Sequence, residues 1–211
     1  MSAAICDRVD RISVVESADA SGYASPDTQR SVGFASPIDA PNLVARAASG
    51  TEVFADAVAL MGDALGVDLE RIGSEFEFAR ATADHDLGFI VIPEGTMAGV
   101  RGCWFCVYRD RRVIELRFEW KMRTHLEPDW TLRHGYFVEI DGEPRVRSPL
   151  QLLPPPDWDE PDFMGLGMIM TAMPAVNAIP AVCAAASGVV TAAQLPLVTA
   201  RGFVARETGA R

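Results

Sequence analysis

The sequence predicts an α+β fold, in which a largely antiparallel or mixed open sheet of about five to seven strands carries helices packed on one face. Three observations support this prediction. Several segments between residues 70 and 148 alternate apolar and polar side chains, as half-buried strands do. Segments typical of helices flank that region. The chain has 211 residues, 49% of them hydrophobic, which suits a single domain over residues 1–211 with a sizeable core.

The first expected element is a strand over residues 8–16. Ile12 and Val14 fall on one face of this strand, and polar residues fall on the other. Residues 17–48 are rich in Ser, Pro, Gly and Asp, which indicates a long loop. Because unstructured loops of this length are uncommon in compact domains, we expect this loop to cover a site or a partner surface.

An amphipathic helix is expected next, over residues 53–66. Ser49 and Glu52 have the spacing of a capping box at its start, and Gly66 is placed to end it. The apolar stripe of this helix consists of Phe54, Val58, Met61 and Leu65.

Strands are expected over residues 75–82, 103–108 and 113–123. The last of these alternates most regularly, and its charged side chains are expected to face water. A turn is expected between Arg109 and Arg112, and the dipeptide Asp141-Gly142 suits the type I′ turn of a hairpin. The apolar face of the 113–123 strand consists of Ile114, Leu116, Phe118, Trp120 and Met122.

Residues 149–162 form a Pro-rich acidic segment that predicts an extended connector. No charged residue occurs from Phe163 to Ala200, which is long enough for a membrane span. Three prolines, several polar residues and the lack of a flanking Lys/Arg cluster argue against that interpretation. We therefore expect no membrane contact, and predict a buried helix over residues 165–188.

Composition excludes several classes of function. The formal net charge is −10, and an acidic chain repels phosphate backbones, so we expect no nucleic-acid binding. Four cysteines in a chain of this length do not form a disulfide scaffold. The sequence begins without the apolar segment of a secretory signal, so we expect a cytoplasmic protein.

The motifs that usually carry cofactors or metals are missing. The pair Cys103 and Cys106 lies in a predicted strand, where positions three apart point to opposite faces, so a structural role is favoured over a redox or zinc site. Gly165-Leu166-Gly167 is not a dinucleotide fingerprint, because Met170 stands where the third glycine is needed. The sequence therefore predicts no cofactor-binding residues and no metal ligands.

Four strings resemble one known family in order and spacing. They are "IPEGTMAGVRG", "RVIELRFEWKM", "YFVEIDGEP" and "TAMPAVNAIPAVCAAASGVVTAAQLPLV". Together with the opening "ICDRVDRISVVESADASGYASP", they resemble the C-terminal domain of the dihydrodipicolinate-reductase-like proteins that include 2,4-diaminopentanoate dehydrogenase. The resemblance covers nearly the whole chain.

This resemblance implies hydride transfer between a nicotinamide and an amine, imine or related substrate. In the family the C-terminal domain supplies the substrate pocket and the subunit contacts, and a Rossmann domain precedes it. We therefore expect NAD(P) only if a separate Rossmann domain is present, and no nucleotide bound by this chain alone. The expected partners are a small-molecule ligand, a second copy in a homodimer, and a separate nucleotide-binding chain.

Three functions stay open on this reasoning, and so does the question of whether the chain is itself catalytic. The first is a substrate-binding and oligomerisation domain related to NAD(P)-dependent amine or imine oxidoreductases. The second is a free-standing, cofactor-independent isomerase, cyclase or lyase that reuses the same pocket. The third is a non-catalytic small-molecule-binding module.

Candidate site residues follow from side-chain chemistry. Proton transfer or carbonyl and amine orientation is assigned to the candidate catalytic residues Glu119, His125 and Asn177. Small-molecule pockets are mostly apolar and aromatic with a few polar groups. On that basis the candidate substrate-binding residues are Glu94, Trp104, Tyr108, Trp120 and Tyr136.

Overall fold

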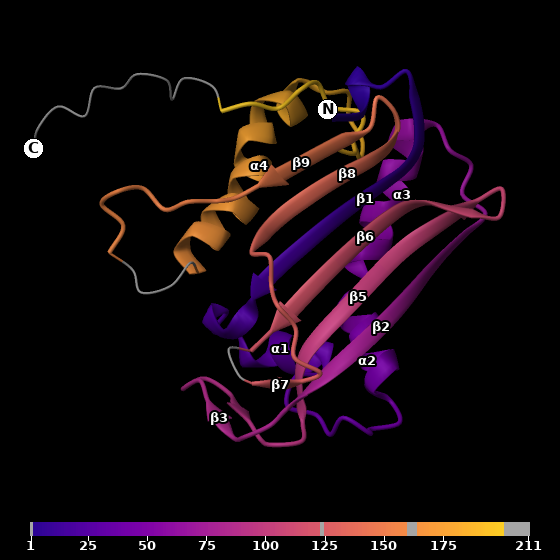
Figure 1. Cartoon of the computed structure of the whole chain (residues 1–211). Coiled ribbons are helices and arrows are strands. Elements are labelled where there is room, and N and C mark those ends of the chain that lie inside the picture. The colour runs from indigo at the N-terminus through magenta and orange to yellow at the C-terminus, as the bar shows by residue number, and fades with distance from the viewer. Residues whose placement is uncertain (1, 123–124, 160–163, 201–211) are drawn as a thin grey trace, which may run out of the picture. The chain divides into compact units, whose positions relative to one another are not determined.

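The computed structural model describes residues 2–122, 125–159 and 164–200 (Figure 1). The chain divides into two units, Met1–Leu153 and Pro154–Arg211, where a single domain was predicted. The division falls within the predicted connector over residues 149–162. Strand β9 takes up the start of that segment, and residues 160–162 lie outside the described residues.

Unit 1 is built on a seven-stranded sheet with the order β7-β2-β5-β6-β1-β8-β9. Strands β1 and β6 run parallel and the other neighbours antiparallel, so the predicted mixed open sheet is confirmed. A separate two-stranded hairpin pairs β3 with β4. The strands are β1 (Arg8–Asp19), β2 (Arg71–Ala81), β3 (His85–Asp86), β4 (Val91–Ile92), β5 (Met97–Tyr108), β6 (Arg111–Lys121), β7 (Leu126–Glu127), β8 (Gly135–Glu143) and β9 (Val146–Leu150).

Three α-helices pack on one face of the sheet, as predicted, and cover β2, β5 and β6 (Figure 1). They are α1 (Pro26–Val32), α2 (Leu43–Gly50) and α3 (Val53–Leu65), and short 3₁₀ turns occur at η1 (Ser2–Ile5) and η2 (Ala20–Gly22).

The long loop predicted over residues 17–48 is wrong, because that segment holds the end of β1, all of η2 and α1, and most of α2. Its short helices depend on tertiary contacts that composition does not reveal. The side-chain amide of Gln29 is buried and donates to the carbonyls of Ala20 and Tyr23, at 3.1 Å each. Leu43 and Ala47 anchor α2 in the core.

Helix α3 forms where the apolar stripe predicted it. It ends at Gly66, whose φ of 65° is the left-handed conformation that glycine adopts most readily. The capping box predicted from Ser49 and Glu52 is wrong, because Ser49 lies inside α2 and Glu52 makes no side-chain bond to the helix end.

Strand register separates two faces of the sheet. The face on which the helices pack, called the helix face, carries Ile12, Val14, Glu16 and Ala18 of β1, Ile114, Leu116, Phe118 and Trp120 of β6, and Tyr136, Val138 and Ile140 of β8. The other, called the opposite face, carries Arg11, Ser13, Val15 and Ser17 of β1, Glu115, Arg117 and Glu119 of β6, and Phe137, Glu139 and Asp141 of β8.

The opposite face holds a lattice of ion pairs, as the alternating charges predicted. Arg11 bridges Glu115 and Asp141 at 3.0 and 3.1 Å, and Arg117 joins the same Glu115 at 3.0 Å. Glu115 is only 4% exposed, so its charge depends on these two guanidinium groups.

One predicted turn is confirmed and another is wrong. Arg109 and Asp110 connect β5 to β6 with φ values of 50° and 57°. The hairpin does not turn at Asp141-Gly142, which stays inside β8. Its turn lies at Pro144, which has no N–H to donate to a strand ladder.

The two cysteines of β5 point to opposite faces of the sheet, as the prediction of a structural role for them required. Cys106 belongs to the hydrophobic core under the helices, and Cys103, three residues earlier, has its side chain on the other face. Both are buried free thiols, and burial raises the pKa of each.

Unit 2 contains one helix, α4 (Met164–Ala184), with Pro174 and Pro180 inside it. It corresponds to the helix predicted over residues 165–188 and ends four residues earlier than predicted. The prediction that this helix is buried is wrong within unit 2. By length and composition, Gly165–Ala184 is apolar enough to cross a membrane, and none of it is buried within unit 2.

The core of unit 1 depends on a close fit between Phe118 and Gly102, its partner on β5. The ring of Phe118 is fully buried, lies over the glycine and contacts the rings of both Phe54 and Trp120. A Cβ atom on residue 102 would overlap this ring, which has no room to move aside.

We expect Gly102→Ala to lower the free energy of unfolding of unit 1 by about 1–3 kcal/mol, because it overpacks the core. Urea denaturation measures this change. As a control, Phe118→Leu makes room for the new methyl group. The free energy of unfolding of the double variant should therefore fall by less than the sum of the decreases in the two single variants. Strict additivity would show that Gly102 and Phe118 do not interact in this way.

Candidate functional site

The helix face is only partly covered by unit 1's own helices. The hydrophobic core beneath α1, α2 and α3 takes residues from β2, β5 and β6, and includes none from β1, β8 or β9. Val14, Leu116 and Val138, side by side in the register, are each half-buried. Ile12 and Ile140, on the same two strands, are buried. The part of the helix face on β1 and β8 therefore lies beside the core under the helices, and it is buried at Ile12 and Ile140 and half-buried at Val14 and Val138.

A carboxyl group lies on this apolar surface. Glu16 follows Ile12 and Val14 on the helix face, and its neighbours across the strands are Phe118 and Tyr136. Burial raises the pKa of Glu16, and hydrogen bonds from Tyr136 and Trp120 lower it, with burial the larger effect. Because the folded-state pKa is raised, this carboxyl contributes stability in its protonated form, and that contribution is lost as the pH rises through the folded-state pKa.

Tyr136 donates its hydroxyl to Glu16 Oε1 at 3.3 Å. Burial and the neighbouring carboxylate raise the pKa of Tyr136 to about 12, so the phenol keeps its proton throughout the neutral range. Tyr136 is thus a permanent donor toward Glu16.

Trp120 forms an aromatic wall beside the carboxyl. Its indole packs on Phe118 with ring centroids 4.3 Å apart and an interplanar angle of 27°, and Phe54 of α3 lies 6.0 Å away. These contacts hold the plane of the indole in place. We call Glu16, Trp120 and Tyr136 the Glu16 cluster.

The Glu16 cluster combines three chemical capacities. A carboxyl whose pKa is raised by burial holds a proton more readily than an exposed carboxyl, which suits it to proton transfer. As a carboxylate it accepts hydrogen bonds from an amine, and the face of an indole attracts a cation. The half-buried apolar side chains around it suit an uncharged hydrocarbon substituent.

Of the residues predicted to bind substrate, the structure brings Trp120 and Tyr136 together. Trp104 is in the core instead, where its indole N–H donates to Thr51 Oγ1 at 2.9 Å beneath α2 and α3, so it does not line an open pocket. Tyr108 lies at the end of β5, beside the guanidinium of Arg109. Glu94 is exposed in the loop after β4.

The predicted catalytic residues lie elsewhere. Glu119 is on the opposite face, 3.6 Å from Arg101, which is the salt-bridged position that charge alternation favoured. His125 is exposed just before β7. Asn177 is half-buried in α4 of unit 2. The structure brings none of the three into the Glu16 cluster within unit 1.

Sequence reasoning missed Glu16, although the signal is present. Ile12 and Val14 were assigned to one face of the first strand, and the same alternation extended by two residues puts Glu16 on that face. A carboxylate on the apolar face of a strand is costly to bury, and so indicates a function or a specific partner.

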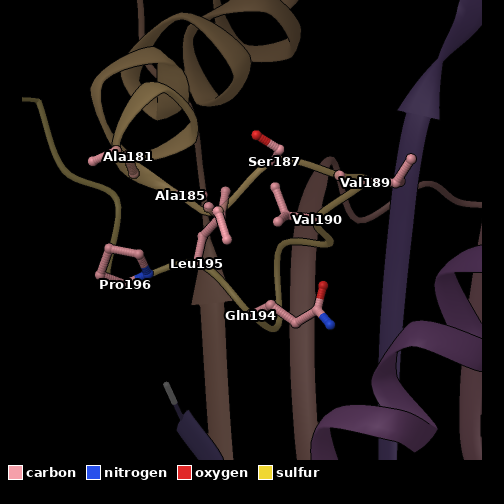
Figure 2. A pocket seen from close by; sticks show the side chains of 11 residues that line it. Ala181, Ala185, Ser187, Val189, Val190, Gln194, Leu195 and Pro196 are labelled. Carbon is pink, nitrogen blue, oxygen red and sulfur yellow. The ribbon is translucent and has the colours of Figure 1, made fainter.

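A shallow hollow lies in unit 2, between the end of α4 and the segment that follows it (Figure 2). Its lining is apolar except for Ser187 and Gln194, and the side-chain oxygen of Gln194 accepts the N–H of Thr191 at 2.8 Å. No titratable side chain lines it. Within the part of the chain that the structure describes, no group of His, Cys, Asp and Glu is placed to hold a metal ion.

Comparisons with known proteins identify relatives of this chain. The family model of the 2,4-diaminopentanoate dehydrogenase C-terminal domain matches residues 1–208. A solved amine dehydrogenase structure from Mycobacterium smegmatis matches with a TM-score of 0.69 and 18% sequence identity, over 94% of this chain and 54% of that chain. The chain thus spans about half the length of that dehydrogenase. No curated protein sequence matches the chain significantly.

The hydrogen bond between Tyr136 and Glu16 stabilises the carboxylate, so Tyr136→Phe should raise the pKa of Glu16 further. The loss of this bond should also lower the free energy of unfolding by about 0.5–1.5 kcal/mol. Carboxyl ¹³C NMR follows the titration of Glu16 directly. Tyr108→Phe, which removes a hydroxyl outside the Glu16 cluster, serves as the control. A pKa of Glu16 that stays unchanged or falls in Tyr136→Phe would contradict the assigned contact.

Proposed function

The chain belongs to the 2,4-diaminopentanoate dehydrogenase C-terminal domain family, and on that premise we propose that it is the substrate-binding and oligomerisation domain of an NAD(P)-dependent amine or imine oxidoreductase. The observation that carries the proposal is the Glu16 cluster on the partly covered half of the helix face. Family membership indicates the reaction class, and the cluster supplies groups suited to an amine.

In this proposal each residue of the cluster has a separate role. Glu16 accepts hydrogen bonds from the amine nitrogen and moves a proton to or from it. Tyr136 donates to Glu16 and sets the orientation of its carboxyl. Trp120 packs against the substrate beside the nitrogen, held in place by Phe118 and Phe54.

The residues present do not fit a nicotinamide nucleotide. A dinucleotide site needs a glycine-rich turn between a strand and a helix, whereas Gly165 and Gly167 lie within α4, and the preceding strand among the described residues, β9, ends at Leu150. We therefore propose that a separate Rossmann domain supplies the hydride-carrying cofactor. This chain binds the substrate, orients it and handles its proton.

The expected homodimer and the expected cytoplasmic location are part of the same proposal. A homodimer in the cytoplasm is consistent with the subunit contacts that the family resemblance assigns to this domain. The exposed apolar side chains of α4, among them Met168, Ile169 and Ile179, are surface that self-association would cover.

A second candidate function is favoured by the raised pKa of Glu16. A half-buried carboxyl with a raised pKa suits a cofactor-independent isomerase, cyclase or lyase, which needs a proton-transfer group in a shaped apolar site. This function would require no nucleotide-binding partner, so the two candidates differ in whether turnover needs a nicotinamide cofactor.

The test is NADPH-dependent reductive amination of small ketones by this chain, alone and when assembled with a nucleotide-binding domain on the same or a separate polypeptide. We expect no NADPH binding or oxidation by the chain alone, and turnover in the assembly. Glu16→Gln should lower kcat/KM by at least about 100-fold, because it removes the proton-transfer group.

Glu119→Gln is the matched control, since it makes the same chemical change on the opposite face. Its kcat/KM should stay within about twofold of the unmodified protein, as expected for a partly exposed ion pair. Tight NADPH binding by the chain alone, or full activity of Glu16→Gln, would contradict the proposal. Turnover of a substrate without any nicotinamide would favour the second candidate.

A further inference from the structure

Tyr136 stands close to the end of two strand ladders. The ladder between β8 and β9 ends at the pair of Tyr136 with Leu150, and the ladder between β8 and β1 ends one residue further, at the pair of Gly135 with Ser17. Terminal pairs of a ladder open more easily than central pairs, because they have a neighbouring pair on one side only. The position of the Tyr136 hydroxyl therefore depends on what holds the chain in front of β8.

The segment in front of β8 is attached to the opposite face of the sheet. Trp130 and Leu132 are buried, and a Cβ atom on Gly99 of β5 would lie 3.1 Å from the Trp130 ring. The guanidinium of Arg101 lies over the same ring, 4.5 Å from its centroid. Lys121, at the end of β6, donates from Nζ to the carbonyl of Trp130 at 3.1 Å. These contacts hold the segment against β5 and β6.

Ser17 continues this attachment on β1. Its hydroxyl oxygen accepts the backbone N–H of Arg133 at 3.0 Å, and the residue is only 1% exposed. The next two residues both have left-handed backbone conformations, with φ of 50° at His134 and 126° at Gly135, and they lead the chain into Tyr136. The N–H that Ser17 holds is thus a short stretch of chain away from the phenol that donates to Glu16.

Ser17 and Glu16 are adjacent on β1 but lie on opposite faces of the sheet, so a ligand on the helix face does not contact Ser17. Resting on the proposed function, in which Tyr136 orients the carboxyl of Glu16, we propose that Ser17 is a positioning residue. Its hydroxyl clamps the start of β8 against β1 and keeps Tyr136 within donating distance of Glu16. A hydrogen bond on one face thereby sets the geometry of the proton-transfer group on the other.

Ser13 provides a matched comparison within the same strand. It lies on the same face as Ser17 and is 4% exposed, but its partners, Glu115 and Glu139, lie inside their ladders rather than at the ends. Neighbouring pairs on both sides hold this part of β8, so removal of the Ser13 hydroxyl should not move Tyr136. The comparison separates the loss of a buried serine oxygen from the loss of the clamp.

The test is the titration of Glu16 in the full chain, followed by carboxyl ¹³C NMR in Ser17→Ala. Because the hydrogen bond from Tyr136 lowers the pKa of Glu16, a displaced Tyr136 should let that pKa rise, in the same direction as Tyr136→Phe and by no more than that variant. Hydrogen exchange of the Arg133 amide should accelerate at least about threefold, because its acceptor is lost. Ser13→Ala should leave the titration of Glu16 unchanged.

The double variant Ser17→Ala/Tyr136→Phe determines whether Ser17 acts through the phenol. Once the hydroxyl of Tyr136 is removed, loss of the clamp has no bond left to weaken, so the pKa of Glu16 should equal that of Tyr136→Phe alone. Ser17→Cys keeps nearly the same side-chain volume and replaces the oxygen with a weak acceptor. It should reproduce the result of Ser17→Ala, and it replaces that variant if Ser17→Ala does not fold.

The outcomes separate this inference from the proposed function. A pKa of Glu16 that is unchanged or lower in the folded Ser17 variants, or that rises equally in Ser13→Ala, would overturn the inference and leave the proposed function standing. A further rise in the double variant would also overturn it, because Ser17 would then act without Tyr136. The proposed function is tested instead by turnover of Glu16→Gln in the assembly. Full activity of that variant, together with the expected titrations, would support the clamp and reject the amine site.

Discussion

The register of β1 between a parallel neighbour, β6, and an antiparallel neighbour, β8, is the constraint on which the rest of the structure depends. Side chains alternate along a strand, so a slip of one residue would exchange the two faces. A slip of β1 would bring Arg11 and Ser13 to the helix side and carry Ile12 away from its neighbours Ile114 and Ile140. The buried apolar residues on one face and the ion pairs on the other oppose that slip together.

The same register determines where chemistry can occur. Glu16 is the one carboxyl that β1 places among apolar side chains, and its neighbours on β6 and β8 supply the indole and the phenol that hold it. Charges that would neutralise it are kept on the far side of the sheet by Glu115 and Asp141. Segregation of charge between the two faces thus stabilises the sheet and places Glu16 among uncharged cross-strand neighbours on β6 and β8.

Patterns of local origin were predictable from the sequence. Alternation along residues 113–123 predicted the strand and its faces, and Gly66 predicted the end of α3. The wrong predictions of secondary structure concern segments whose conformation depends on tertiary contacts. The helices within residues 17–48 depend on buried contacts such as that of Gln29, and Asp141-Gly142 stays in a strand because Pro144 turns the chain two residues later. Family resemblance indicated the domain correctly. Trp120 was selected as an aromatic residue on an apolar strand face and Tyr136 for its polar hydroxyl, and the structure brings the two together beside Glu16; their roles in substrate binding stay predictions. Glu16 was missed because a charged residue near the end of a predicted strand is easily assigned to water.

An experimental structure of the chain with 2-aminopentane bound tests the central claim most directly. The account predicts the amine nitrogen within about 3 Å of a Glu16 carboxyl oxygen, with the propyl group against Trp120 and Val138. An amine found instead among the carboxylates of the opposite face, or in the hollow of unit 2 beside Gln194, would contradict the claim that the helix face of β1 and β8 is the substrate site.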